Sequence, residues 1–149
     1  MGFFDAIEIA GSGLTAERLR MDVTSENLAN AETTRTANGG PYLRKEVVLQ
    51  QQGGGSFGDV LTGAVGGVTA TSAPSGVEVA GIVQDPTSTK QVYDPSHPDA
   101  NAQGYVTEPN INPVTEMVDL ISSSRSYEAN VTAMDSAKQM FTQTLGILR

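Results

Sequence analysis

Both ends of the chain repeat apolar residues every seven positions. The N-terminal segment carries two such rows: Ile7, Leu14, Met21 and Leu28, and three residues on Ala10, Glu17, Thr24 and Ala31. The C-terminal segment carries two more: Leu120, Tyr127, Met134, Phe141 and Leu148, and between them Met117, Ser124, Val131, Lys138 and Leu145. Heptad rows are typical of helices that pair along a seam. The pattern therefore predicts one pairing helix at each end.

Local signals predict where the N-terminal helix begins and ends. Asp5 can cap the first turn, and Glu8 three residues later completes a capping box. Gly11 and Gly13 each cost roughly 1 kcal/mol relative to alanine inside a helix, so the first turns need support from a neighbour. The run Asn38–Pro41 contains two glycines and a proline and must end the helix.

The C-terminal helix has a clear start signal. Asn112 is a good N-cap, and Pro113 suits the first helical position. The segment then continues to Leu145 without glycine or proline. By contrast, 12 of the 16 glycines and six of the seven prolines fall between Asn38 and Asn110. The breakers divide the chain into helix, β or irregular middle, and helix.

The middle of the chain predicts a small sheet. Tyr42–Gln51 and Val77–Gln84 alternate and are rich in β-branched residues, and Lys90–Tyr93 is a candidate third strand. The Gly-rich tract 53–75 has few large apolar residues and is typical of a flexible loop or an extended ribbon.

These elements predict a mainly α fold with a small β middle. Residues 1–37 and 111–149 would form a paired helical assembly domain, and residues 38–110 a β-rich middle domain. The simplest arrangement pairs the terminal helices as an antiparallel coiled coil with the Gly-rich β/loop insertion between them. The pattern leaves open whether a helix pairs within its own subunit or with another subunit. An ordinary helical hairpin would give the same stripes.

A specific register follows from the only charged residue in each seam. Setting Glu17 opposite Lys138 aligns four apolar layers: Ile7 with Leu148, Leu14 with Phe141, Met21 with Met134, and Leu28 with Tyr127. Sliding by one heptad would keep apolar layers but leave both charges unpaired. Apolar residues off the seam would pack on adjacent subunits, and contacts that do not close build helical arrays.

Composition narrows the function classes. Acidic residues number 17 against 9 basic ones, giving a net charge of −8 without a basic patch, which argues against nucleic-acid binding. The chain has no cysteine, so disulfides and thiolate sites are excluded. No secretory signal and no apolar run of membrane-spanning length is visible, which is typical of a soluble chain.

Several segments resemble the axial proteins of the bacterial flagellum. The resemblance rests on residues 14–22 and 27–33 at the N-terminus, 41–45 and 93–106 in the middle, and 116–121 and 124–130 near the C-terminus. Rod, hook and hook-junction proteins share the N-terminal signature, which includes Asn27, Ala29, Asn30 and Thr33. The middle run, with Asp94, Pro95, Gly104 and Tyr105, is most similar to a proximal rod component of the flagellar basal-body rod protein family.

The resemblance implies a structural subunit rather than an enzyme. Such a subunit is exported through the flagellar type III apparatus without a cleaved signal peptide. It assembles in the periplasm, through its terminal helices, into a hollow rod that transmits torque. The implied partners are other copies of the chain, other rod proteins, the export apparatus and the membrane ring at the rod base, with no cofactor and no small-molecule substrate. A secreted coiled-coil adaptor or export substrate that binds one partner is the alternative.

Two patterns suggest chemistry but have simpler explanations. Gly53, Gly55 and Gly58 match a dinucleotide fingerprint, and Ser56 among them matches a nucleophile elbow. Both motifs need a helix directly afterwards, and residues 59–67 contain three more glycines instead. The tract therefore favours a flexible loop.

His97 lies between Asp94 and Asp99, which could suggest a metal site. Flanking Pro95 and Pro98 instead favour a rigid turn. Asn27 and Asn30, three residues apart near a helix end, are typical of local backbone caps.

Overall fold

The computed structural model describes residues 3–37, 39–52 and 76–147. In chain order the elements are α1 (Phe3–Ala29), β1 (Lys45–Gln51), β2 (Val77–Gln84), β3 (Thr89–Tyr93), β4 (Tyr105–Pro109) and α3 (Pro113–Ile147). The predicted class, two terminal helices with a small β middle, is confirmed. The Gly-rich tract 53–75, with its two catalytic-looking patterns, and Leu148 lie outside the described residues.

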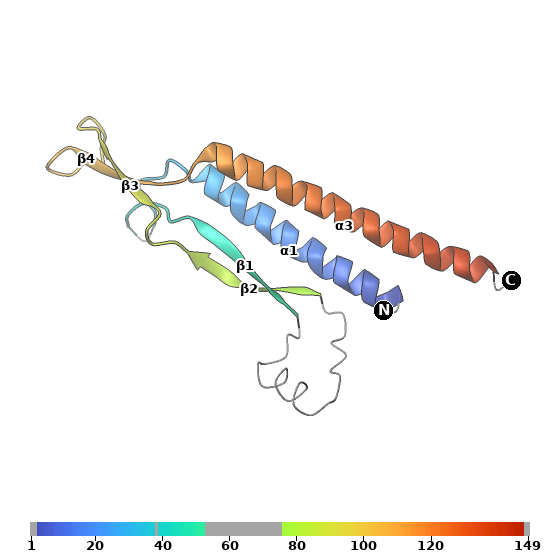
Figure 1. Cartoon of the computed structure of the whole chain (residues 1–149). Coiled ribbons are helices and arrows are strands. Elements are labelled where there is room, and N and C mark those ends of the chain that lie inside the picture. The colour runs from blue at the N-terminus through green and yellow to red at the C-terminus, as the bar shows by residue number, and fades with distance from the viewer. Residues whose placement is uncertain (1–2, 38, 53–75, 148–149) are drawn as a thin grey trace, which may run out of the picture.

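The two helices lie side by side and run in opposite directions, so the chain termini lie at the same end (Figure 1). The Val114 N–H donates to Asn112 Oδ1 over 3.0 Å, which confirms Asn112 as the N-cap of α3. The N-cap prediction for Asp5 is wrong, because α1 begins at Phe3 and Asp5 lies in its first turn.

α1 ends earlier than the glycines and the proline in the run Asn38–Pro41 require. It stops at Ala29, and Asn30 closes its last turn by donating to the Glu26 carbonyl over 2.9 Å. Thr33 then donates to Asn30 Oδ1 over 3.2 Å. Asn30 is thus a local cap, as the sequence predicts.

The β middle forms two sheets rather than the single sheet predicted. β1 pairs with β2, and β3 pairs with β4, each antiparallel. The β1–β2 ribbon packs along α1, and the β3–β4 hairpin lies beyond the end where α1 stops (Figure 1). The bounds of β2 match the prediction, β1 begins three residues later than predicted, and β4 was not predicted.

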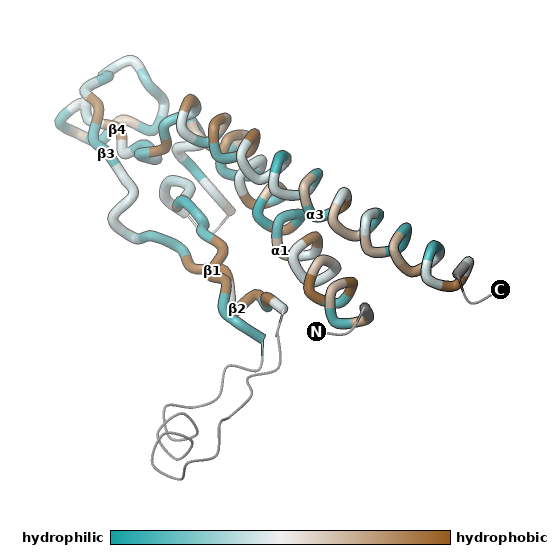
Figure 2. The backbone as a smooth tube through the Cα atoms, turned by 45° about the vertical axis from the view of Figure 1, so that its right-hand side comes forward, coloured by the Kyte–Doolittle hydropathy of each residue, from teal (hydrophilic) through white to brown (hydrophobic). Residues whose placement is uncertain are grey.

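Few large side chains are fully buried in the described part of the chain. The buried apolar residues are mostly small, such as Ala10, Ala16, Val23 and Ala137. Apolar and polar positions alternate along both helices, with apolar bands at the start of α3 (Figure 2). This thin core fits the low aromatic content of 5%.

The seam of α3 uses a different companion row from the one predicted. Leu120, Tyr127 and Met134 are half-buried, in line with the first predicted row. The second row lies one residue earlier than predicted and consists of small or polar residues: Glu116, Ser123, Asn130 and Ala137. Val131, Lys138 and Leu145 are exposed and lie outside the contact between α1 and α3 of one chain.

The predicted register is also wrong. Phe141 lies against Phe4, with ring centroids 6.4 Å apart, rather than against Leu14. A Cβ built on Gly13 would come within 2.9 Å of the Asn130 amide nitrogen, which places these two residues opposite each other. Glu17 pairs with Arg20 on its own helix and not with Lys138.

Packing between the two helices explains why position 13 is a glycine. With no side chain, it lets α3 approach α1 closely at Asn130. The contact with α3 supplies the support that glycine in a helix interior requires.

Candidate functional site

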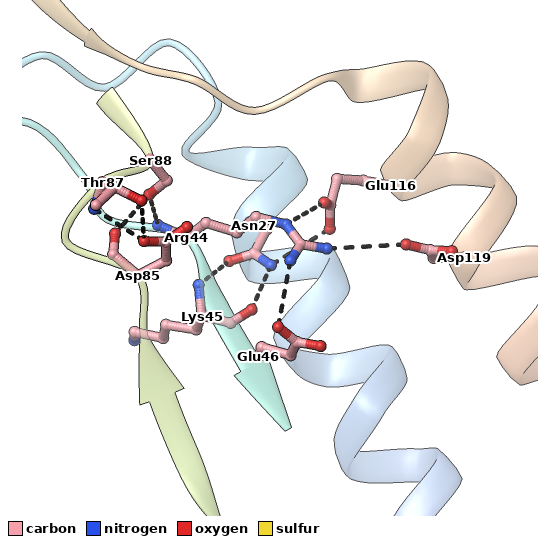
Figure 3. A network of polar contacts seen from close by, with 9 residues as sticks. All are labelled: Asn27, Arg44, Lys45, Glu46, Asp85, Thr87, Ser88, Glu116 and Asp119. Carbon is pink, nitrogen blue, oxygen red and sulfur yellow. Dashed lines mark hydrogen bonds and ion pairs between the residues drawn. The ribbon is translucent and has the colours of Figure 1, made fainter. Parts of the chain in front are cut away.

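Two of the buried polar side chains meet at one junction, where α1 ends, β1 begins and α3 begins. Asn27 comes from the last turn of α1 and is 1% exposed. Glu116 comes from the first turn of α3 and is 2% exposed. Figure 3 shows these side chains pointing toward Arg44 and Lys45 at the start of β1. We call Asn27, Tyr42, Arg44, Lys45 and Glu116 the polar junction.

The Asn27 amide uses its full hydrogen-bonding capacity. Its nitrogen donates to the Lys45 carbonyl over 2.8 Å and to Glu116 Oε2 over 3.3 Å. Its oxygen accepts from the Lys45 N–H and from the Tyr42 hydroxyl, each over 3.0 Å. The side chain therefore pairs with both backbone groups of Lys45, much as a neighbouring strand would. Asn27 is thus more than the local backbone cap that its position predicts, because its partners lie on β1, on α3 and at Tyr42.

The Glu116 carboxylate is neutralised from the other side. Arg44 Nε donates to Glu116 Oε1 over 2.7 Å, and this bond is the main reason that the pKa of Arg44 is raised. The same guanidinium lies 3.8 Å from carboxylate oxygens of Glu46 and Asp119. A buried carboxylate left without such a partner would be strongly destabilising.

The turn between β2 and β3 is tied to the same place. The Arg44 N–H donates to Ser88 Oγ over 3.1 Å, and Ser88 Oγ donates to the Asp85 carbonyl over 2.7 Å (Figure 3). The Asn110 N–H, just before α3, donates to the Ser88 carbonyl over 2.8 Å. Both β units and both helices therefore meet at the polar junction.

Burial of the Tyr42 ring raises the pKa of its hydroxyl to about 12, and the charges of Glu26 and Glu116 add to the shift. The folded state holds this proton more tightly than the unfolded chain does. The stabilisation is therefore complete below pH 10 and is lost as the pH rises from 10 toward 12.

Tyr42→Phe should lower the free energy of unfolding by about 1 to 2 kcal/mol at pH 7, because Asn27 Oδ1 loses one donor. It should also remove the loss of stability that Tyr42 causes between pH 10 and 12. Urea unfolding at several pH values measures both effects. Tyr93→Phe, at an exposed ring, is the control and should keep the alkaline loss. An unchanged alkaline profile in Tyr42→Phe would contradict the assignment.

A groove of about 230 Å³ opens beside the polar junction, between α1, β1 and α3. Its lining is mostly polar and mixed in charge, and it includes Arg20, Lys45, Glu46, Asp119 and Ser123. Lys45 Nζ is held 2.5 Å from Glu26. The arrangement joins segments that lie far apart along the chain.

The residues that the sequence assigns to a motif in the middle run, Asp94, Pro95, Gly104 and Tyr105, lie in or beside the loop of the β3–β4 hairpin. Asp94 Oδ1 accepts from the Ser96 N–H and hydroxyl, and these bonds lower the pKa of Asp94. Gly104 has a φ of +82°, and a Cβ there would lie 2.9 Å from the Tyr93 ring. Only glycine fits that conformation and that contact. Tyr93 and Tyr105 meet edge to face, with centroids 5.2 Å apart.

Pro95 and Pro98 predict a turn around His97. Hydrogen bonds hold this turn in place. The Asp99 N–H donates to His97 Nδ1 over 3.1 Å, and the Asp99 carboxylate accepts from Thr34. Within residues 3–37, 39–52 and 76–147, no group of three or more His, Asp or Glu side chains is arranged to hold a metal ion.

The remaining predicted pairing residues and the N-terminal motif residues differ in how exposed they are. Ile7, Leu14, Met21 and Leu28 of α1 are half-buried, as are Leu120, Tyr127 and Met134 of α3. Ala29 of the motif is exposed, and Thr33 is half-buried beyond the end of α1. Heptad analysis did not find Glu116 or Arg44, because neither is apolar and their partners lie far along the chain. The only sequence signal for Glu116 was its position in the resembled C-terminal run.

The outer side of α3 keeps large apolar residues exposed. Four of them fall at helical spacing on one face: Val114, Met117, Val118 and Ile121. We call them the α3 stripe. Met140, Phe141 and Leu145 are exposed farther along the same helix. Among the described helices, none combines the length and apolarity needed to cross a membrane.

Comparison with known proteins assigns the chain to a family. The family described as "Flagella basal body rod protein" matches residues 7–35, and "Flagellar basal body rod FlgEFG protein C-terminal" matches residues 102–147. The flagellar basal-body rod protein FlgC of Bacillus subtilis is 50% identical over 99% of both chains. FlgC of Borreliella burgdorferi is 44% identical over 100% of this chain and 99% of its own. FlgC of Escherichia coli O6:H1 is 39% identical over 97% of both. With its polar junction built on the motif residue Asn27, the chain belongs to the flagellar basal-body rod protein family.

Proposed function

We propose that this rod protein is a subunit of the proximal section of the rod and joins its neighbours through its terminal helices. The main observation that supports this proposal is the α3 stripe. α3 packs on α1 along one side only, and its opposite side keeps Val118 and Ile121 more than half exposed. Large apolar side chains grouped on an exposed helix face mark a protein interaction site. In a rod, other copies of the chain and other rod proteins would cover them.

In this proposal, residues 1–37 and 111–149 form the assembly domain, and residues 38–110 form a middle domain. The helical rows pair as an antiparallel coiled coil, and the exposed seam candidates Val131, Phe141 and Leu145 contact adjacent subunits. The polar junction fastens the middle domain to the helices, so a subunit can pass torque as one body. Contacts between unlike surfaces continue from copy to copy and build a hollow helical array.

We also propose a route by which the chain reaches the rod. The chain passes the type III export apparatus without a cleaved signal peptide and assembles in the periplasm, with the membrane ring at the base as a neighbour. It catalyses no reaction of its own. The names of the relatives, all flagellar basal-body rod proteins, support a structural role.

Imaging of basal bodies from a strain without this chain tests the proposal. We expect membrane rings without a rod and cells that do not swim, and the wild-type chain supplied in trans should restore both. Complete rods in the deletion strain would contradict the proposal and favour an adaptor that binds one partner.

A further inference from the structure

The polar residues in the seam between α1 and α3 follow a regular spacing. Asn27 contacts Glu116, and Gly13 lies against Asn130. The two contacts are two heptads apart on each helix. Between them, one heptad from each, Arg20 and Ser123 line the same groove. The seam thus contains a polar row, formed by Arg20 and Asn27 on α1 and by Asn130, Ser123 and Glu116 on α3, with Gly13 against Asn130.

The apolar row of α3 cannot by itself define a register. Leu120, Tyr127 and Met134 repeat every seven residues, and so do Leu14 and Met21 of α1. Sliding α3 by one heptad, about 10 Å, replaces one apolar side chain by another. Polar residues within a seam discriminate strongly between registers, because a buried polar group without a partner is costly.

We propose that the polar row, with Glu116 as its decisive member, sets the register of the helix pair. A slide in one direction moves Glu116 past the end of α1 at Ala29. A slide in the other brings it opposite Arg20 but removes it from Asn27 and Arg44. Either slide separates the buried carboxylate from Asn27 and Arg44, the two donors that it contacts in the observed register.

The register matters because it decides which part of α3 extends past α1. Phe4, near the start of α1, lies against Phe141, so the last turns of α3 project beyond this contact. A slide by one heptad would lengthen or shorten this projection by about two turns. The inference deepens the proposed function, because neighbouring subunits in a rod would meet this end.

Disulfide trapping tests the proposal in the full chain, which has no cysteine of its own. The pair Gly13→Cys with Asn130→Cys reports the observed register. Gly13→Cys with Ser123→Cys, and Gly13→Cys with Ala137→Cys, report a slide by one heptad in either direction. With Glu116 present, only the first pair should cross-link efficiently.

Glu116→Leu should raise the ratio of slid to observed cross-links by about tenfold, equivalent to about 1.4 kcal/mol. Glu116→Gln, which keeps an acceptor for Asn27, is the matched control and should change the ratio little. Circular dichroism confirms that each variant is helical. If Glu116→Leu folds and shows the wild-type cross-link pattern, the short connections of the chain set the register and the proposal is wrong. Rod assembly could still proceed in that case, so the proposed function would stand.

Discussion

Asn27→Asp should lower the free energy of unfolding by about 3 kcal/mol or more, within the range found when a buried charge loses its partner. The change is nearly isosteric and leaves the acceptor for Tyr42 and the Lys45 N–H. It replaces the donor that faces the Lys45 carbonyl and Glu116 Oε2 by a second carboxylate oxygen. Acceptors would then face each other in a site that is 1% exposed. Thermal and urea unfolding, followed by circular dichroism, measure the loss.

Asn30→Asp is the matched control. Asn30 lies only three residues away, but its amide bonds locally to the Glu26 carbonyl and is partly exposed. A carboxylate at this helix end should cost at most about 1 kcal/mol through the helix dipole. Equal losses in the two variants would show that Asn27 acts only as a helix cap.

A double variant measures the direct interaction between the side chains at positions 27 and 116. In Asn27→Asp with Glu116→Gln, the new amide at position 116 can donate to the new carboxylate at position 27. We expect the double variant to be more stable than the sum of the single losses predicts, with a coupling energy of about 1 kcal/mol or more. Additive losses would contradict direct pairing of the two side chains.

Val118→Asp combined with Ile121→Asp should abolish swimming and incorporation into the rod. Both side chains are more than half exposed, so the folded chain should lose little stability. In an assembled rod, two carboxylates would enter an apolar contact without a partner, which prevents association. Swimming halos in soft agar, together with quantification of the chain in purified basal bodies, measure the effect.

Thr115→Asp provides the control for this pair. Thr115 is exposed on the same helix but lies off the α3 stripe, and an acidic residue in a first turn is favourable. This variant should swim and assemble normally. Normal rods in the Val118→Asp, Ile121→Asp strain would show that the α3 stripe is not an assembly surface.

The sequence predicted elements with strong local signals. Asn112 and Pro113 determine the start of α3 within a few residues, and alternation in Val77–Gln84 determines β2. The sequence pattern does not predict β4, whose first residue, Tyr105, belongs to the motif of the middle run. The division into two sheets depends on which strands pair, and that choice involves contacts far apart along the chain.

The seam shows where pattern analysis fails. Hydrophobic periodicity found Leu120, Tyr127 and Met134, because these are large and apolar. It could not find Glu116 and Ser123, which occupy the other half of the seam and are polar. The register was wrong for the same reason. Glu17 and Lys138 suggest one register, whereas the buried acidic side chain that contacts the opposite helix is Glu116.

The β1–β2 ribbon has one end at which added residues would cost the fold little stability. The polar junction holds one end of the ribbon. The other end is closed where the Gln52 N–H donates to the Gly76 carbonyl and the Val77 N–H donates to the Ser12 hydroxyl. Residues added between 53 and 75 would enter beyond this closure and leave Asn27 and Glu116 in place. The closure at Gln52 and Gly76 is therefore a natural position at which to insert an epitope or fluorescent label.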